Sequence, residues 1–406
     1  MKTIALIGTC DTKKEELIFV TNKLREADIN CILLDVSTKP GYISKADFTP
    51  AQIFAAGNYK IEEVHTKKKF EMLHSIAVGV AALVDQLFRE GKIQGAMSIG
   101  GLQNSNIGCH AMQVLPVGIP KVMVSTVACG QRVFESLVGT KDIVIFPSVS
   151  DFTGMNIVST VILSNAAYAL AGMLKHGGKE IEKKEAIGAT FMGATNDGVA
   201  NAIEFLKEAG HEVIAFHSTG TGGRAMEELI DQGIVNAVLD MTLHEVVYEY
   251  FGYGFGYGAN NRIAMGAKKG IPMVICPGGI DFMCQWKWQL FDDIDTRIYN
   301  WHNETLAHVK LRVKEAVDIS KIIIDRLNLA TGPVEVIMPT QGLRSFAQKG
   351  EELYDPDVDQ AIFDTFEKNL RKDIPFKYFD ANFCDIEFSR FAADEMMKML
   401  ERTYGR

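Results

Sequence analysis

The chain has 406 residues, of which 47% are hydrophobic and 23% are charged, and its formal net charge is −9. This length allows two or three domains with separate cores, and the composition is that of an ordinary globular protein. The acidic balance argues against nucleic acid as the main partner, because contacts to a phosphate backbone need a basic surface. A small anionic ligand remains compatible with it, since a local group of backbone donors binds phosphate on an acidic protein as well.

The cysteines and the N-terminal residues indicate a cytoplasmic protein. The seven cysteines are odd in number and no pair has CxxC spacing, which is typical of reduced, mostly buried thiols. The start MKTIALIGT resembles a signal peptide only briefly, because the charged CDTKKEE follows at once. No continuous apolar run reaches the ~18 residues of a membrane span. We therefore expect no membrane partner.

Short apolar runs alternate with amphipathic segments along the first half. Strands are expected in IALIG, NCILLD, IQGAMSIG, GIPKVMVS and at 143–146, and helices at 13–27, 70–90 and 156–175. Residues 39–58, rich in small and polar residues, are expected to leave the sheet. Such alternation predicts βαβ units with buried parallel strands.

The second half repeats this order. Strands are expected in AIGATFM, HEVIAFH, VNAVLDM, GIPMVICP and VEVIMP, with helices at 199–209 and about 303–327. The charged segment KEIEKKE, residues 179–185, marks the boundary between domains 1–180 and 181–406. The sequence thus predicts an α/β protein of two Rossmann-like domains, doubly wound and mostly parallel. We expect these domains to be related by internal duplication and to face each other across a cleft, the second carrying a helical and aromatic C-terminal extension.

Polar turns at the strand ends are the candidate ligand sites, because ligands of open parallel sheets bind beyond the carboxyl ends of the strands. In the first half, the turn GTCDTK precedes a helix whose N-terminus attracts anions, and the main-chain N–H groups of the turn SIGGLQNS can form a concavity for anions. Asp35 is placed to accept from a ribose hydroxyl, and Arg132 is a candidate counter-charge. Capping by Asp11 or Thr12 is the alternative role for the first turn. The nucleotide-binding candidates are Gly8, Thr9, Asp11, Thr12, Lys13, Asp35, Ser37, Thr38, Ser98, Gly100, Gly101, Ser125 and Thr126.

In the second half, HSTGTGGRAMEEL combines glycines with an arginine at a helix start, which suits a phosphate or carboxylate. The anion-binding candidates there are Thr219, Gly220, Thr221, Gly222, Gly223 and Arg224. Further on, alternate glycines in YFGYGFGYG allow close approach by a ligand or another chain segment, or belong to a flexible aromatic loop.

Signals for catalysis are fewer. His217, His244, Glu245 and Asp281 fall near predicted strand ends, where they could converge as acid and base. Each also suits the role of a cap or of a satisfied polar group. No histidine pairs with another ligand at metal-binding spacing, so no protein metal site is expected. Mg²⁺ that accompanies a nucleotide would leave little trace in the sequence.

Several motifs resemble those of the Tm-1-like ATP-binding family, also called UPF0261. They are GTCDTKKEEL, DVST, SIGG, FPSVSDFTGMN, MGATNDGV, FHSTGTGGRAMEEL, GIPMVICPGGIDF and PTQGLRSF, and they span nearly the whole chain. The resemblance implies two Rossmann-like halves, self-association and ATP binding. Two segments depart from the family pattern: DMTLHEV has His244 where a small polar residue is usual, and GGIDFMCQW keeps Asp281 but lacks an asparagine and a final glycine.

The first hypothesis is therefore a cytosolic nucleotide-binding protein, with ATP and possible Mg²⁺ as cofactor, acting on a small phosphorylated or carboxylated metabolite. A sugar-nucleotide epimerase or glycosyltransferase is the second, and a non-catalytic ligand-binding regulatory module is the third. The partners expected are a small anionic ligand and further copies of the chain in a homo-oligomer.

Overall fold

The computed structural model describes residues 1–39, 41–64, 66–128, 135–177 and 184–405. The chain divides into two compact units, Met1–Ile181 (unit 1) and Glu182–Arg406 (unit 2). Most of the charged segment 179–185, where the sequence places the domain boundary, lies outside the described residues. Each unit has its own parallel sheet and its own core.

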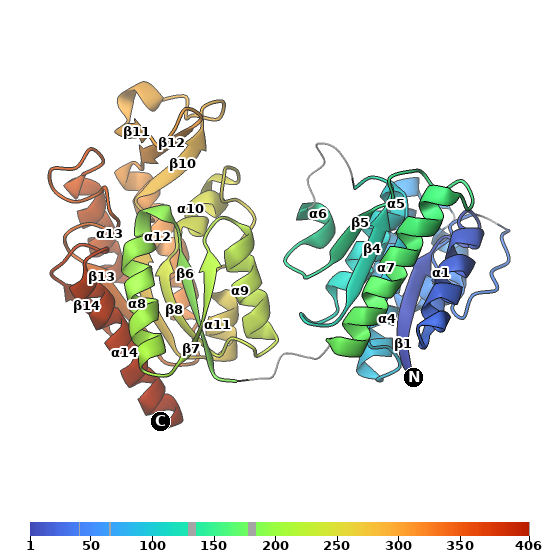
Figure 1. Ribbon diagram of the computed structural model, residues 1–406. Coiled ribbons are helices and arrows are strands. Elements are labelled where there is room, and N and C mark those ends of the chain that lie inside the picture. The colour runs from blue at the N-terminus through green and yellow to red at the C-terminus, as the bar shows by residue number, and fades with distance from the viewer. Residues whose placement is uncertain (40, 65, 129–134, 178–183, 406) are drawn as a thin grey trace. The chain divides into compact units, whose positions relative to one another are not determined.

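Unit 1 is built on a parallel sheet with the strand order β2-β1-β3-β4-β5 (Figure 1). Its strands are β1 (Lys2–Gly8), β2 (Ile29–Asp35), β3 (Ala96–Gly100), β4 (Lys121–Ser125) and β5 (Val144–Pro147). Its helices are α1 (Lys14–Glu26), α2 (Pro50–Ala56), α3 (Ile61–Val64), α4 (Lys69–Arg89), α5 (Leu102–Gln113), α6 (Glu135–Val138) and α7 (Ile157–His176). This is the 2-1-3-4-5 order of doubly wound folds.

Helices cover both faces of this sheet because successive strand residues point to opposite sides. Ile4 and Leu6 of β1 pack in one apolar cluster with α1 and α7. Ala5 and Ile7 pack in another with α4 and α5. All four side chains are fully buried. The continuous apolar runs of the sequence are therefore strands that are buried on both faces.

Two helices of unit 1, α4 and α7, are long and apolar enough to cross a membrane by length and composition alone. In α7 the buried residues Leu163, Ala167, Leu170 and Leu174 recur at helical spacing. They belong to the cluster that covers the sheet. One apolar stripe of α7 therefore packs on the sheet.

Unit 2 repeats the architecture. Its main sheet is parallel, in the order β14-β13-β9-β8-β6-β7 (Figure 1). The strands of this sheet are β6 (Ala186–Phe191), β7 (Glu212–His217), β8 (Ala237–Thr242), β9 (Met273–Gly278), β13 (Val334–Pro339) and β14 (Phe376–Phe379). The helices are α8 (Asn196–Glu208), α9 (Thr221–Asp231), α10 (His244–Phe251), α11 (Ala264–Lys269), α12 (Val313–Asn328), α13 (Pro356–Asn369) and α14 (Ile386–Tyr404). Its first five strands in chain order follow the same 2-1-3-4-5 order, which confirms the predicted pair of doubly wound units.

The layers of unit 2 also follow the alternation of strand residues. One core contains α8 and α14 with β6, and the other contains α9 to α13 with β8, β9 and β13. Val199 and Leu206, predicted to share one face of α8, are both buried in the first of these cores.

A small antiparallel sheet in unit 2 corrects one expectation. The predicted helix at about 303–327 is wrong in its first part, because β12 (Leu306–Lys310) pairs there with β10 (Phe282–Trp286) and β11 (Tyr299–Trp301). Every residue of β12 is buried, so this segment lacks the solvent-exposed face of an amphipathic helix. The helix α12 begins only at Val313. Figure 1 shows this sheet beyond one end of the main strands of unit 2.

Candidate functional site

In unit 1 the carboxyl ends of β1 and β3 are the expected binding point. These strands are neighbours, yet the chain leaves β1 toward β2 on one side and reaches β3 on the other. In doubly wound sheets of this order, ligands bind in the crevice at this switch point. The turn Gly8–Lys13 begins at the last residue of β1, and the pair Gly100–Gly101 begins at the last residue of β3.

The backbone donors of the first turn have partners inside the chain. The Thr12 and Lys13 N–H groups donate to the Thr9 carbonyl at 3.2 and 2.8 Å. The Thr9 and Thr12 hydroxyls pair with each other at 2.8 Å. The Lys13 ammonium donates to the Phe152 carbonyl. These contacts leave Lys13 bound to a neighbouring loop of its own unit.

Asp35, the predicted ribose ligand, is fully buried at the end of β2. Its Oδ1 accepts from the Cys10 N–H at 3.1 Å and from the Ser37 N–H at 2.9 Å. The Ser37 hydroxyl accepts from the Asp11 N–H at 3.1 Å. Among the described residues, the second oxygen of Asp35, Oδ2, has no hydrogen-bond partner. Asp35 therefore holds the turn through Oδ1, and its Oδ2 remains an unpaired acceptor. The remaining candidate of this strand end, Thr38, is half-buried.

The turn after β3 leads into α5 through glycine. Gly101 is the N-cap of α5, and no side chain caps this helix. Gly100 has a φ of +155°, and a Cβ there would lie 2.7 Å from the Asn104 Cβ. The buried Asn104 amide donates to the Ser98 hydroxyl at 3.2 Å and to the Ile99 carbonyl. Its Oδ1 has no partner in the part of the chain that the structure describes.

Two serines predicted to face the ligand are held inside the sheet instead. The buried Ser98 hydroxyl donates to the Ile7 carbonyl at 3.1 Å. The Ser125 and Ser105 hydroxyls pair at 2.7 Å. Thr126 is half-buried, and its hydroxyl oxygen lies 3.6 Å from the place of a Cβ on Gly101. Arg132, the candidate counter-charge, lies outside the described residues.

In unit 2 the predicted anion turn before α9 already holds a carboxylate of the chain. Glu245 Oε1 accepts from the Gly220 N–H at 2.6 Å and from the Gly223 N–H at 3.1 Å. A Cβ on Gly223 would overlap the Glu245 carboxylate. The glycine is needed so that this carboxylate reaches the helix N-terminus. Glu245 itself is 1% exposed.

Arg224 and His217 have partners other than this internal carboxylate. Arg224 is half-buried, and its Nε lies 4.0 Å from Glu228 Oε1 on the same helix. The exposed His217 ring pairs with the Thr219 hydroxyl at 3.2 Å. Thr221 is the first residue of α9, and it is exposed.

Arg262, which the sequence did not single out, is the counter-charge of this internal carboxylate. It is fully buried, and its Nη2 donates to both oxygens of Asp240 at 2.8 Å, while Nη1 donates to Glu245. Glu227 lies near this group and accepts from the Ile263 N–H at 2.5 Å. Burial raises the pKa of Glu227 to about 7. The cluster is a buried salt-bridge network that fixes the N-termini of α9 and α11.

The alternate glycines of 252–258 allow close packing within unit 2. A Cβ on Gly254 would lie 2.7 Å from the Tyr248 ring, and one on Gly256 would overlap the same ring. A Cβ on Gly220 would lie 2.6 Å from the Tyr257 carbonyl. The loop therefore wraps Tyr248 and supports the turn before α9.

His244, the residue that departs from the family pattern, is fully buried beside that tyrosine. Its Nδ1 lies 2.6 Å from the Gly279 carbonyl, and its Nε2 lies 3.0 Å from the Tyr248 hydroxyl. Burial lowers the pKa of His244 to about 4. A carbonyl only accepts, so the neutral ring carries its proton on Nδ1, while its Nε2 lies against the Tyr248 hydroxyl, which also donates to the Cys284 carbonyl at 3.3 Å.

The fourth catalytic candidate, Asp281, sits between two buried cations. Lys310 Nζ donates to it at 2.9 Å and Arg344 Nε at 3.0 Å. Burial alone would raise the pKa of this carboxyl, but Arg344 and Lys310 hold it below its usual range. The structure thus brings His244 to the segment that carries Asp281, because the His244 ring contacts the Gly279 carbonyl and stacks on Phe282 with a centroid distance of 4.4 Å. His217 is not part of this group.

Sequence interpretation missed the basic members of this group. Arg344 belongs to the motif PTQGLRSF, which follows an apolar strand as the other polar turns do. This position after a strand could have identified Arg344 as a candidate site residue. His308 and Lys310 lie on β12, in the stretch predicted to be helical, so nothing in the sequence indicated that they lie near Asp281.

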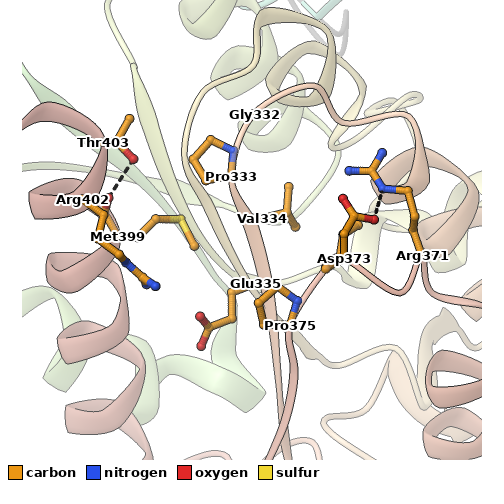
Figure 2. A pocket seen from close by; sticks show the side chains of 11 residues that line it. Gly332, Pro333, Val334, Glu335, Arg371, Asp373, Pro375, Met399, Arg402 and Thr403 are labelled. Carbon is orange, nitrogen blue, oxygen red and sulfur yellow. Dashed lines mark hydrogen bonds and ion pairs between the residues drawn. The ribbon is translucent and has the colours of Figure 1, made fainter.

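Among the described residues, no three histidine, cysteine or acidic side chains are grouped so that they could hold a metal ion. A cavity of about 350 Å³ lies at the opposite, amino edge of the unit 2 sheet (Figure 2). Its Arg371 donates to Asp373 at 2.7 Å and to the Asn328 carbonyl at 2.8 Å. Arg371 is therefore already engaged, and Arg402, which also lines the cavity, donates from Nε to the Lys398 carbonyl at 3.1 Å.

The strand orders and the polar turns at the carboxyl edges define a doubly wound α/β protein with two such units. The chain belongs to the UPF0261 family. Residues 2–179 match the "Uncharacterised protein family (UPF0261) N-terminal domain" and residues 184–400 match its C-terminal domain. The resemblance drawn from the motifs is confirmed.

Relatives of the chain include bacterial and plant proteins. A UPF0261 protein of Clostridium tetani is 36% identical over 409 residues, which cover 99% of this chain and 100% of that protein. The ToMV resistance protein Tm-1(GCR237) of Solanum lycopersicum is 32% identical over 93% of this chain and 54% of its own length. A solved UDP-N-acetylglucosamine 2-epimerase from Rickettsia bellii covers 99% of each chain with a TM-score of 0.23 and 10% identity. Nothing about activity follows from so low a score.

Proposed function

We propose that unit 1 binds a nucleotide, with ATP as the first candidate, at the carboxyl ends of β1 and β3. The observation that carries this proposal is the buried acceptor Asp35 Oδ2, which lacks a partner among the described residues, together with the N-terminus of α5, where the N-cap residue Gly101 provides no capping side chain. An unpaired acceptor needs a donor, and the hydroxyls of a ribose can donate to it. The free N–H groups at a helix N-terminus are donors, so they bind an acceptor such as a phosphate.

The strand register sets the spacing of these features. Asp35 pairs with Gly8 across β2 and β1, and Ile7 pairs with Ser98 across β1 and β3. Neighbouring strands lie about 4.8 Å apart, so Asp35 and the end of β3 are separated by roughly 10 Å. The ribose is therefore proposed at Asp35 and the phosphates at Gly101, one on each side of β1.

The charge of the two helix starts favours α5 over α1 for the phosphates. Glu15 and Glu16 lie in the first turn of α1, whereas the first turn of α5 has no acidic residue. A phosphate at α1 would meet two like charges, and a phosphate at α5 would meet none from that helix. The α1 turn serves in this proposal to hold Asp35.

Gln103→Glu should weaken ATP binding at least tenfold, about 1.4 kcal/mol. Gln103 is exposed in the first turn of α5, and helical side chains point toward the N-terminus. A carboxylate there favours the helix itself while repelling phosphate, so lost binding would not reflect lost folding. Calorimetric titration with ATP, with and without Mg²⁺, measures the change.

Gln103→Met is the matched neutral control and should keep ATP affinity within about twofold. Equal affinity of the Gln103→Glu and native proteins would remove α5 from the site. Heat from UDP-sugars but not from ATP would instead support the sugar-nucleotide alternative. An absence of heat with every nucleotide would contradict the proposal as a whole.

A further inference from the structure

Arg344 lies in the loop that follows β13, at the carboxyl edge of the unit 2 sheet. Three neighbouring strands and loops hold this segment in place. The Gly279 N–H donates to the Leu343 carbonyl at 3.2 Å, and the Ser345 N–H donates to the Ala194 carbonyl at 3.0 Å. The Asn382 amide donates to the Arg344 carbonyl at 3.1 Å. The backbone of Arg344 is thus fixed above the ends of β6 and β9.

The guanidinium of Arg344 is fully buried but only partly bonded. Its Nε donates to both oxygens of Asp281, at 3.1 and 3.0 Å, and its flat face lies 3.9 Å from the Phe282 ring centroid. Within the described residues, neither Nη1 nor Nη2 has a hydrogen-bond partner. A guanidinium never loses its charge in a protein, so its terminal fork needs acceptors. Arg262 shows the contrast, because both of its Nη groups donate to carboxylates.

The charges around the fork favour a monoanion over a dianion. Lys310 Nζ lies 2.9 Å from Asp281 and 3.1 Å from Asp359, so two cations and two carboxyl groups nearly balance. His244 and His308 add no positive charge at neutral pH, because burial lowers their pKa values to about 4 and about 3. A carboxylate presents two oxygens in the plane that an arginine fork matches, with one charge.

A glycine in the turn beside the same segment is exposed. Gly193 lies in the turn between β6 and α8, next to Ala194, which bonds to the Arg344 loop. A Cβ built on Gly193 would meet no atom within 4 Å. This turn is at the switch point of unit 2, since β6 lies between β7 and β8.

We propose that unit 2 binds a small carboxylate through Nη1 and Nη2 of Arg344, at the carboxyl ends of β6, β9 and β13. Asp281 and Phe282 hold the guanidinium from its Nε edge and from its face. This site is in a different unit from the nucleotide site proposed above and rests on different residues.

The test measures thermal unfolding and calorimetry of the full chain with sodium acetate, lactate and succinate, each against sodium chloride of equal ionic strength. At least one carboxylate should raise the unfolding temperature in a saturable manner that chloride does not reproduce. Arg344→Lys keeps the charge and a bond to Asp281 but lacks the fork, so its affinity should fall at least about tenfold. Arg312→Lys, at an exposed arginine, is the matched control and should bind as the native protein does.

A second variant covers the case in which Arg344→Lys does not fold. Gly193→Leu leaves the arginine unchanged and places a side chain in the open space, so it should also abolish the saturable effect. Gln103→Glu in unit 1 should leave carboxylate binding intact, which separates this site from the nucleotide site. The proposal is overturned if none of the three carboxylates stabilises the native protein beyond chloride. It is equally overturned if the stabilisation survives in folded Arg344→Lys and Gly193→Leu proteins.

Discussion

Arg262→Met should destabilise unit 2 by about 3–5 kcal/mol, the usual cost of removing one partner from a buried ion pair. Arg262 is fully buried and is the direct counter-charge of Asp240 and Glu245. Without it both carboxylates stay in the interior beside Glu227, and none can reach water without opening the turn before α9. Urea unfolding at neutral pH, followed by circular dichroism, measures the loss.

The controls separate stranded charge from lost packing. Arg312→Met, at an arginine whose side chain is 44% exposed, should cost no more than about 1 kcal/mol. Adding Asp240→Asn and Glu245→Gln to Arg262→Met should recover part of the loss, since the combined variant leaves no unpaired carboxylate of this pair. An Arg262→Met protein as stable as Arg312→Met would show that the network contributes nothing.

Lowering the pH should decrease the free energy of unfolding of unit 2 before the surface carboxyl groups are protonated. Burial lowers the pKa of His244 from 6.5 to about 4, so the unfolded chain binds more protons than the folded one between these values. Stability therefore falls as pH decreases through this window, by roughly 3 kcal/mol for a shift of this size. Burial, assisted by Arg344, lowers the pKa of His308 to about 3, which extends the loss to lower pH.

Two buried carboxyl groups act in the opposite direction. Burial raises the pKa values of Asp359 and Glu227, so the folded state takes up protons there first and gains stability as pH falls. Unfolding measured at pH 7, 6, 5 and 4 should show a smaller net loss in His244→Asn than in the native protein. The exposed His176 provides the matched control, His176→Asn, whose profile should follow the native one. Identical profiles for all three proteins would contradict the assignment.

Most of the fold was predictable because a buried parallel strand has a local signature. Runs such as IALIG and IVIF are apolar without interruption, and each precedes a polar turn and a helix that packs on the sheet. The failure at 303–327 has a physical cause. The strand β12 is short and antiparallel, and its polar residues His308 and Lys310 are buried against partners far along the chain.

The candidate site was predictable in position but not in chemistry. Turns at the carboxyl ends of strands follow from topology, and Asp35, Gly101 and Asp281 lie in such turns. Which donors are already engaged depends on contacts across the unit. Nothing local in the sequence shows that Glu245 reaches Gly223, or that Arg344 has an unbonded fork while Arg224 lies beside Glu228.

The position of Glu245 makes the α9 end of unit 2 independent of metabolite supply. The Glu245 carboxylate is part of the chain, so it supplies negative charge to the start of α9 at every concentration of metabolites. A dissociable ligand would supply that charge only while it is bound. The helix start at Gly101 has no such built-in charge. If unit 1 binds a nucleotide as proposed, its folding should respond to nucleotide levels in its surroundings, and α9 should stay ordered in starved and replete conditions alike.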